Sequence, residues 1–165
     1  MGIVCLGIIG GAGVFDGGGV RQEVLRIARA EVGVKERTGN NDGPRVEEYL
    51  AYTGLKKGNP YCASFVSWCF HKAGYDQPRT AWSPSMFPAS RMVKEPKPAD
   101  VFGVYFPEFK RIAHAGIVAE IKGDWLVGYE GNSNNDGSRN GDGVYQRLRH
   151  KRTVSRYADW IILKQ

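Results

Sequence analysis

Cys62 is the residue of this chain best placed to act as a nucleophile. It follows Asn59–Pro60 and falls in the first turn of a helix predicted over residues 61–73, since proline is well accommodated at a helix start. Unpaired N–H groups and the helix dipole at that end favour a thiolate, the reactive form of cysteine. The alternative for a free cysteine is a small buried hydrophobe, which is what we expect of Cys69 deeper in the same helix.

A nucleophilic cysteine needs a histidine as its base. His71 lies on the same predicted helix, about 13 Å from Cys62 along the axis, which is too far. His150 stands in RLRHKR, where a solvated strand end is the simpler interpretation. His114 opens the predicted strand HAGIVAEI after a polar loop, so it can face a cleft while the strand behind it packs in the core. We therefore favour His114 as the base, with a purely structural histidine as the alternative.

The imidazole of such a pair is held by an orienting group. The next predicted strand, WLVGYEGN, ends with Glu130 and Asn132. They are two positions apart, so both point to one face if the strand is regular. Either could accept a hydrogen bond from the His114 ring, unless the segment is only a strand end entering a turn.

Other polar residues suggest substrate contacts. Tyr61, Trp82 and Arg139 are candidate substrate-binding residues; Arg139 could bind a carboxylate through its fork of donors, or be simply solvated. The loop at 132–143 partly resembles a calcium loop but lacks the terminal glutamate, so we expect a turn and no metal. We interpret the alternating basic residues Arg147, Arg149 and Lys151 as charges that protect a sheet face or edge, rather than as a strip that binds anionic polymer.

The elements that must position these residues come in two groups. Helices are predicted over residues 20–36, 45–52 and 61–73, and a proline-rich segment at 76–98 should wrap the surface or form short helical turns. Strands are predicted over residues 100–106, 114–121, 125–130, 143–148 and 160–163. Helices followed by strands indicate an α+β fold, with the helices packed on an antiparallel sheet of five or six strands. A cysteine on a helix, then His and Glu/Asn on adjacent strands, is the layout of papain-like folds.

Composition sets the broad class. With 165 residues, 42% hydrophobic and 24% charged, the chain should form one soluble globular domain and not a disordered one. A net charge of +6 favours an anionic partner without choosing among them. The cysteines are most simply free thiols, since Cys62 and Cys69 are too far apart on one helix for a disulfide. Residues 1–19 are apolar and glycine-rich and suggest an arm or an atypical export segment, too short to span a membrane, before a single domain at 20–165.

Several segments together resemble a known family. PYCASFVSWCF, then AHAGIV, then EGN with GDGVYQR after a Gly/Asn-rich turn, are similar to CHAP domains. These are the cysteine, histidine-dependent amidohydrolases/peptidases, related to NlpC-type cell-wall peptidases. The resemblance runs from about residue 24 to residue 160, and Ala99–Asp100 stands where the family usually has Gly-Asp. It implies that Cys62, His114, Glu130 and Asn132 form the catalytic set.

The resemblance also implies an activity. The expected enzyme is a peptidoglycan hydrolase of the cell envelope or the exterior, attacking an amide in the stem peptide or at the sugar–peptide junction. We expect no metal or organic cofactor, no nucleic acid and no stable membrane insertion. Composition and spacing by themselves support only acyl-transfer chemistry. The alternatives are a phage lysin module or secreted antibacterial effector, which would add an inhibitor or immunity protein as a partner, an inactive wall-binding relative, and a nucleic-acid binder.

Overall fold

The computed structural model describes residues 17–136 and 140–161 of the chain. The helices are α1 (Gly17–Ala30), α2 (Pro44–Tyr52) and α3 (Cys62–Lys72), with short 3-10 helices η1 (Ser83–Met86), η2 (Ala89–Arg91), η3 (Pro107–Phe109) and η4 (Lys151–Thr153). The strands are β1 (Met92–Val93), β2 (Val101–Phe106), β3 (Arg111–Lys122), β4 (Trp125–Ser133), β5 (Gly143–His150) and β6 (Arg156–Ala158). They form one antiparallel sheet in the order β1-β6-β2-β3-β4-β5. The predicted α+β class with N-terminal helices on an antiparallel sheet is confirmed.

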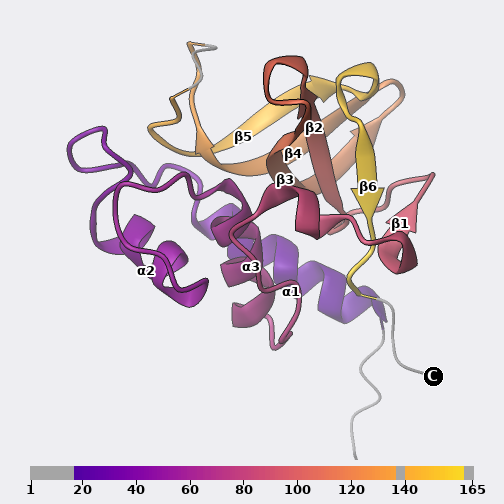
Figure 1. Ribbon diagram of the computed structural model, residues 1–165. Helices are drawn as coiled ribbons and strands as arrows, with labels where there is room; N and C mark the ends of the chain where they lie inside the picture. The colour runs from indigo at the N-terminus through magenta and orange to yellow at the C-terminus, as the bar shows by residue number, and fades with distance from the viewer. Residues whose placement is uncertain (1–16, 137–139, 162–165) are drawn as a thin grey trace, which may run out of the picture.

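The three helices gather on one side of the sheet, and α3 contacts both β3 and β4 (Figure 1). The larger core lies between them, where Phe65 and Phe70 of α3 meet Ile117 of β3. A smaller core on the opposite face joins Phe102, Val104, Val118 and Leu126. Neighbouring residues such as Val101 and Phe102 therefore pack on different sides, as the alternation of a strand requires.

Two predicted elements are wrong in their bounds. The first helix ends at Ala30, not at residue 36, because the chain turns at Gly33, where φ is 100°. The Gly33 N–H then donates to the Val144 carbonyl and the Val144 N–H donates to the Val34 carbonyl, which extends the edge of the sheet at β5. The last strand is Arg156–Ala158 and not 160–163. Trp160 instead donates its indole N–H to the Met86 carbonyl at 3.1 Å and packs against the core.

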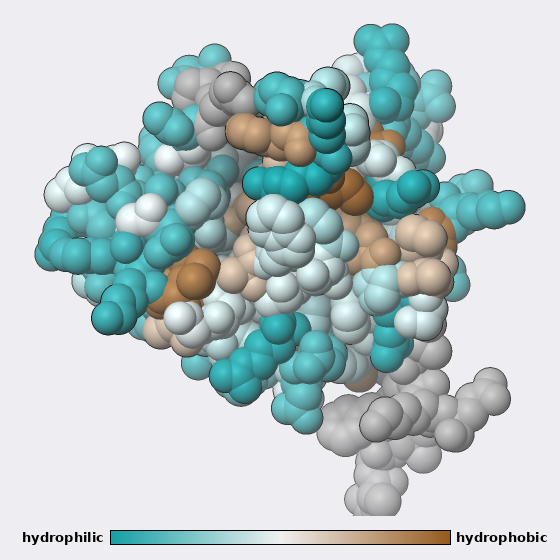
Figure 2. All heavy atoms as spheres, in the orientation of Figure 1, coloured by the Kyte–Doolittle hydropathy of each residue, from teal (hydrophilic) through white to brown (hydrophobic). Residues whose placement is uncertain are grey.

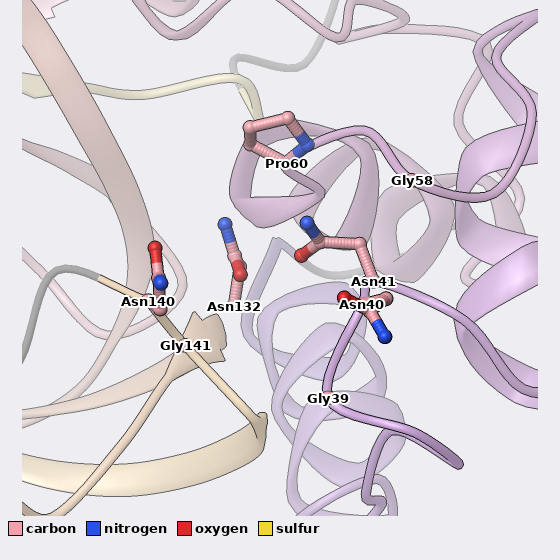
Figure 3. Close-up of a pocket in the computed structure, with 8 residues that line it drawn as sticks. All are labelled: Gly39, Asn40, Asn41, Gly58, Pro60, Asn132, Asn140 and Gly141. Atoms are coloured by element: carbon pink, nitrogen blue, oxygen red, sulfur yellow. The ribbon is translucent and has the colours of Figure 1, made fainter.

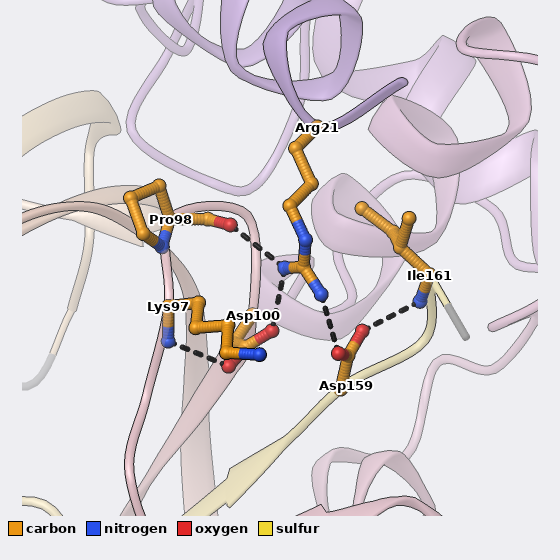
Figure 4. Close-up of polar contacts among 6 residues, drawn as sticks. All are labelled: Arg21, Lys97, Pro98, Asp100, Asp159 and Ile161. Atoms are coloured by element: carbon orange, nitrogen blue, oxygen red, sulfur yellow. Dashed lines mark hydrogen bonds and ion pairs between the residues drawn. The ribbon is translucent and has the colours of Figure 1, made fainter. Parts of the chain in front are cut away.

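A polar network ties the first helix to β2 and β6, which are neighbours in the sheet (Figure 4). Arg21 of α1 donates to the Pro98 carbonyl and to Asp100, both at 2.8 Å, and also pairs with Asp159. Asp100 accepts a further bond from the Lys97 backbone N–H at 2.7 Å. Asp100 precedes β2 and Asp159 follows β6, so one guanidinium joins three segments far apart in the sequence.

Figure 2 shows one face of the molecule as mainly hydrophilic, with small apolar patches scattered over it. None of the helices in the described part of the chain is both long and apolar enough to cross a membrane. The predicted arm or export segment at residues 1–19 falls almost entirely outside the described residues, and Cys5 lies outside them as well.

Candidate active site

Cys62 is the first residue of α3, with Tyr61 at the N-cap. Its side chain is buried, and its Sγ lies 3.4 Å from the hydroxyl of Ser83, which begins η1 and is buried as well. The thiol therefore sits at the positive end of the helix dipole and beside a hydroxyl donor, two features that favour its ionised form. Cys62 and Cys69 are both free and buried, and Cys69 belongs to the core as expected.

His114 reaches this thiol from β3. Its Nε2 is bonded to Glu130 at 2.7 Å, while the ring also hydrogen-bonds Cys62, which leaves Nδ1 for the sulfur. The pairing of β2 with β3 shifts register here: Val104 faces His114 and Tyr105 faces Ile112, so Ala113 is an extra residue. A bulge of this kind re-aims side chains. It helps His114 to turn toward the helix end.

Glu130 is completely buried and holds the other side of the imidazole. Arg149 clamps it with two bonds, Nε to Oε1 at 2.5 Å and Nη2 to Oε2 at 2.6 Å. A buried carboxylate needs such a partner because desolvation otherwise penalises its charge. Gly116 and Gly128 leave space for the side chains of Phe102 and Glu130. A Cβ at either glycine would collide with the Phe102 ring, and a Cβ at Gly116 would also lie 2.9 Å from the Glu130 side chain.

The charges of Cys62, His114, Glu130 and Arg149 stabilise one another. Burial alone would raise the pKa of the Cys62 thiol, but the hydrogen bond and charge of His114 and the Ser83 hydroxyl bring that pKa down to about 7. Burial alone would lower the pKa of His114, but its bonds to Cys62 and Glu130 and their negative charges raise that pKa to about 9. Burial opposes ionisation of Glu130 too, yet Arg149 and His114 hold its pKa at about 2. Near pH 8 the arrangement favours a thiolate–imidazolium pair over the neutral pair.

Asn132 does not share the face of Glu130, contrary to the expectation from a regular strand. Between Glu130 and Ser133 the pairing of β4 with β5 shifts register, and Asn132 adopts a φ of 52°, in the left-handed region. The His114 ring is hydrogen-bonded to the Glu130 carboxylate, which accepts from it. Asn132 instead lines two neighbouring cavities.

The predicted substrate-binding residues lie in different environments. Tyr61 is completely buried against Tyr49, so it supports the site from beneath and offers no surface to a substrate. Its hydroxyl lies near Glu36 and the Asn132 backbone without a well-aligned hydrogen bond to any described residue. Trp82 is 51% exposed and adjoins Ser83, so it remains available. Arg139 lies outside the described residues.

Two cavities open beside the pair. One, of about 610 Å³, is lined by His114 together with three arginines and two phenylalanines of the sheet side. The other, of about 330 Å³, is lined by asparagines and glycines from the loop before α2 and from the β4–β5 connection (Figure 3). Both include Pro60, Asn132 and Asn140. Because they share these residues, the two cavities adjoin as one cleft, and His114 lines its larger part.

Sequence reasoning missed two residues of the site. Arg149 was interpreted as a surface charge, but it points inward to Glu130; the only sequence signal was its place on a strand beside WLVGYEGN. Ser83 lies in the proline-rich segment, and no local pattern points to it. The other two histidines are placed as expected, since His71 stacks on Tyr52 and His150 caps η4.

No group of three or more His, Cys, Asp or Glu residues in the described ranges could hold a metal ion. In the described part of the 132–143 loop, the Asp142 carboxylate accepts from Lys35 and Tyr145.

Comparisons with known proteins identify the fold. The peptidoglycan hydrolase RipB from Mycobacterium tuberculosis is similar over 98% of this chain and 75% of its own, with 18% identity and a TM-score of 0.55. Two weaker likenesses were found. Ly7917 has 17% identity and a TM-score of 0.48 over 83% of this chain and 60% of its own. The Resuscitation Promoting Factor Interacting protein RipA has 15% identity and a TM-score of 0.49 over 87% of this chain and 62% of its own. The chain thus spans about three fifths of the length of these two. No family model and no curated protein matches it, so the resemblance to CHAP domains stays a prediction. The likeness to RipB shows that this chain has the same fold as that hydrolase.

Proposed function

We propose that the protein is a cysteine hydrolase that cleaves amide bonds of peptidoglycan. The observation that carries the proposal is the buried series Ser83–Cys62–His114–Glu130–Arg149, which ends beside an open cleft. The series has the parts of a thiol acyl-transfer site: a thiol with a lowered pKa, a base in contact with it, and a fixed orienting carboxylate. The cell-wall substrate is supported by the sequence resemblance and by the fold shared with RipB, a peptidoglycan hydrolase.

In the first half of the reaction Cys62 would attack as a thiolate, its proton resting on His114. The sulfur bonds to the amide carbon, and the carbonyl electrons move to oxygen. The N-terminal N–H groups of α3, including that of Cys62, lie next to this position and would donate to the oxyanion. The intermediate collapses as the C–N bond breaks, and the imidazolium gives its proton to the leaving amine. A thioester on Cys62 remains.

In the second half His114, now neutral, would take a proton from water. The resulting hydroxide adds to the thioester carbon, and the C–S bond breaks to release the carboxylic acid. The thiolate and the imidazolium are both restored. Glu130 stabilises the imidazolium and fixes the ring throughout, while Arg149 keeps Glu130 ionised.

The cleaved bond belongs to one of two classes. A stem-peptide endopeptidase would cut between amino acids, and an N-acetylmuramoyl-L-alanine amidase would cut the junction of sugar and peptide. Either activity places the working enzyme in the cell envelope or outside the cell. A phage lysin module or a secreted antibacterial effector would use the same chemistry.

Digestion of purified peptidoglycan by the wild-type protein and by Cys62→Ala tests the proposal. Mass analysis of the fragments should reveal new amino termini with the wild type only, and their identity distinguishes endopeptidase from amidase. Equal digestion by the two proteins would exclude the mechanism. Binding without cleavage by the wild type would instead identify an inactive wall-binding relative.

A further inference from the structure

The larger cavity beside His114 has an unbalanced positive charge. Arg111, Arg147 and Arg149 line it, and none of its described lining residues is acidic. Glu130 neutralises Arg149 from below. Arg111 and Arg147 form no ion pair with any residue in the described ranges. Two guanidinium groups in one cleft, without a carboxylate, are expected to attract a negative group of the ligand.

The backbone directs Arg111 into this cavity. In a regular strand Arg111 and His114 would point to opposite faces, since they are three positions apart. The register shift around Ala113 removes that alternation, and Arg111, Ala113 and His114 all line the same space. Any group that Arg111 binds therefore lies close to the reacting pair.

Aromatic rings hold Arg111 in place. Its guanidinium carbon is 4.2 Å from the centroid of the Trp82 ring and 5.4 Å from that of Phe109. One Nη1 donates to the Ile112 carbonyl at 3.1 Å, and no other hydrogen bond of the guanidinium is formed with a described residue. A stacked guanidinium loses little conformational freedom when it binds and keeps its other donors for a planar acceptor. Trp82 also adjoins Ser83, whose hydroxyl contacts Cys62, so this stack lies near the nucleophile.

We propose that Arg111, with Arg147 lining the same cavity, forms a carboxylate-binding subsite that selects substrates carrying a free carboxylate next to the scissile amide. The inference rests on the proposed function for the identity of its ligand, a stem peptide. The neighbouring cavity supports the assignment by contrast. Asn41 and Asn132 project into it (Figure 3), and its described lining residues carry no charge. The two sides of the cleft thus differ in charge, and the carboxylate belongs on the arginine side.

Two stem-peptide fragments that differ only in one group test the subsite: one has a free side carboxylate and the other has the carboxamide there. Hydrolysis by the wild type gives kcat/KM for each fragment. Calorimetric binding to the Cys62→Ala variant measures the subsite without any chemistry. Arg111→Gln, alone and combined with Cys62→Ala, is the test variant. Arg91→Gln is the matched control, because Arg91 is also half-buried and stacked on an aromatic ring, that of Trp160, but lines neither cavity.

The carboxylate fragment should bind and react better than the carboxamide. Arg111→Gln should lose about 10- to 100-fold in binding and in kcat/KM for the carboxylate fragment, and little for the carboxamide. Arg91→Gln should match the wild type with both fragments. Equal losses on both fragments, or no preference in the wild type, would overturn the subsite. If neither fragment nor intact peptidoglycan is hydrolysed but binding shows the preference and its loss in Arg111→Gln, the subsite stands and the proposed hydrolase fails.

Discussion

The ionisation of Cys62 depends on neighbours that reach it from separate segments: Ser83 from η1, and His114 from β3 with Glu130 behind it. Only His114 supplies a positive charge, so it has the largest opposing effect on a thiol that burial would otherwise keep protonated. Removal of the histidine is therefore predicted to raise the pKa of the Cys62 thiol more than removal of the hydroxyl does.

In the His114→Ala variant the pKa of Cys62 should rise from about 7 to above its ordinary value of 9.0, because burial then acts without the imidazolium. The rate of alkylation by iodoacetamide, followed against pH, measures that pKa directly. Hydrolysis should fall by about 100- to 10,000-fold, as expected for removal of a general acid–base. Ser83→Ala should raise the thiol pKa by less. An unchanged alkylation profile in His114→Ala would contradict the pairing.

The pH dependence of wild-type kcat/KM should be bell-shaped. The acid limb reports the Cys62 thiolate with a pKa of about 7, and the rate falls below it as the thiolate is protonated. The basic limb reports the His114 imidazolium with a pKa of about 9, and the rate falls above it because the leaving amine receives no proton. The two groups are coupled, so the limbs belong to the pair. A profile that rises without a basic limb would contradict the role of His114 as acid.

Arg149 is predicted to be a positioning residue that acts through Glu130. Arg149→Gln leaves a buried carboxylate with one partner fewer and should lower the free energy of unfolding by about 3 kcal/mol. It should also move the basic limb of kcat/KM to higher pH, because Glu130 is still ionised there and, without the guanidinium charge beside it, stabilises the imidazolium more. Chemical denaturation and the pH profile measure the two effects. Arg152→Gln, an exposed basic residue of η4, is the control and should change neither.

The ionisation of Glu130 also makes the free energy of unfolding depend on pH. Its pKa is about 2 in the folded protein against an ordinary value of 4.5. The stability that it contributes is therefore complete above pH 4.5 and is lost as the pH falls toward 2. In Arg149→Gln the free energy of unfolding should be lower above pH 4.5, and it should decrease less as the pH falls toward 2.

At the scale of elements, strands β2 to β5 and helix α3 could be predicted from pattern, but the bulges at Ala113 and at Asn132 could not. The apolar run after Cys62 and the strand HAGIVAEI are local signals, so the positions of Cys62 and His114 followed from the sequence. Register shifts at Ala113 and at Asn132 depend on how two strands pair, which is not visible within either strand. For this reason the face to which Asn132 points and the entry of Arg111 into the cavity cannot be read from the sequence.

The contact between α3 and β4 sets the position of the nucleophile. A Cβ at Gly131 would lie 2.6 Å from the Phe65 Cβ on α3. Phe65 cannot move away there by changing rotamer, so Gly131→Ala must displace the helix that begins with Cys62. We expect a loss of about 1–3 kcal/mol in the free energy of unfolding and a lower kcat/KM. Gly19→Ala, where α1 leaves open space, should instead be neutral or slightly stabilising. An active, fully stable Gly131→Ala would contradict the close packing.

At the scale of the whole molecule, the order of helices before strands predicted the fold class, but not how the edge of the sheet formed by β1 and β6 is built. The strand β6 is only three residues long and β1 only two, too short to give a pattern. Their place depends on distant contacts, above all on Arg21, which bonds Asp100 and Asp159 across more than 70 residues in each case. No local window of sequence contains both partners.

The same network predicts where stability is concentrated. Arg21→Gln leaves the Asp100 side chain, which is 1% exposed, without its main counter-charge, so the free energy of unfolding should fall by about 3 kcal/mol. Arg26→Gln is the matched control on the same helix, because its pair with Glu23 lies in solvent and exposed pairs contribute little. Urea denaturation of both variants, beside kcat/KM at a permissive temperature, separates stability from catalysis. Since the network lies outside the cleft, the folded fraction of Arg21→Gln should retain wild-type kcat/KM. Equal stability of the two variants would show that Arg21 does not hold the helix to the sheet, and the segment after β6 would then have to be held by the packing of Trp160 and Ile161 alone.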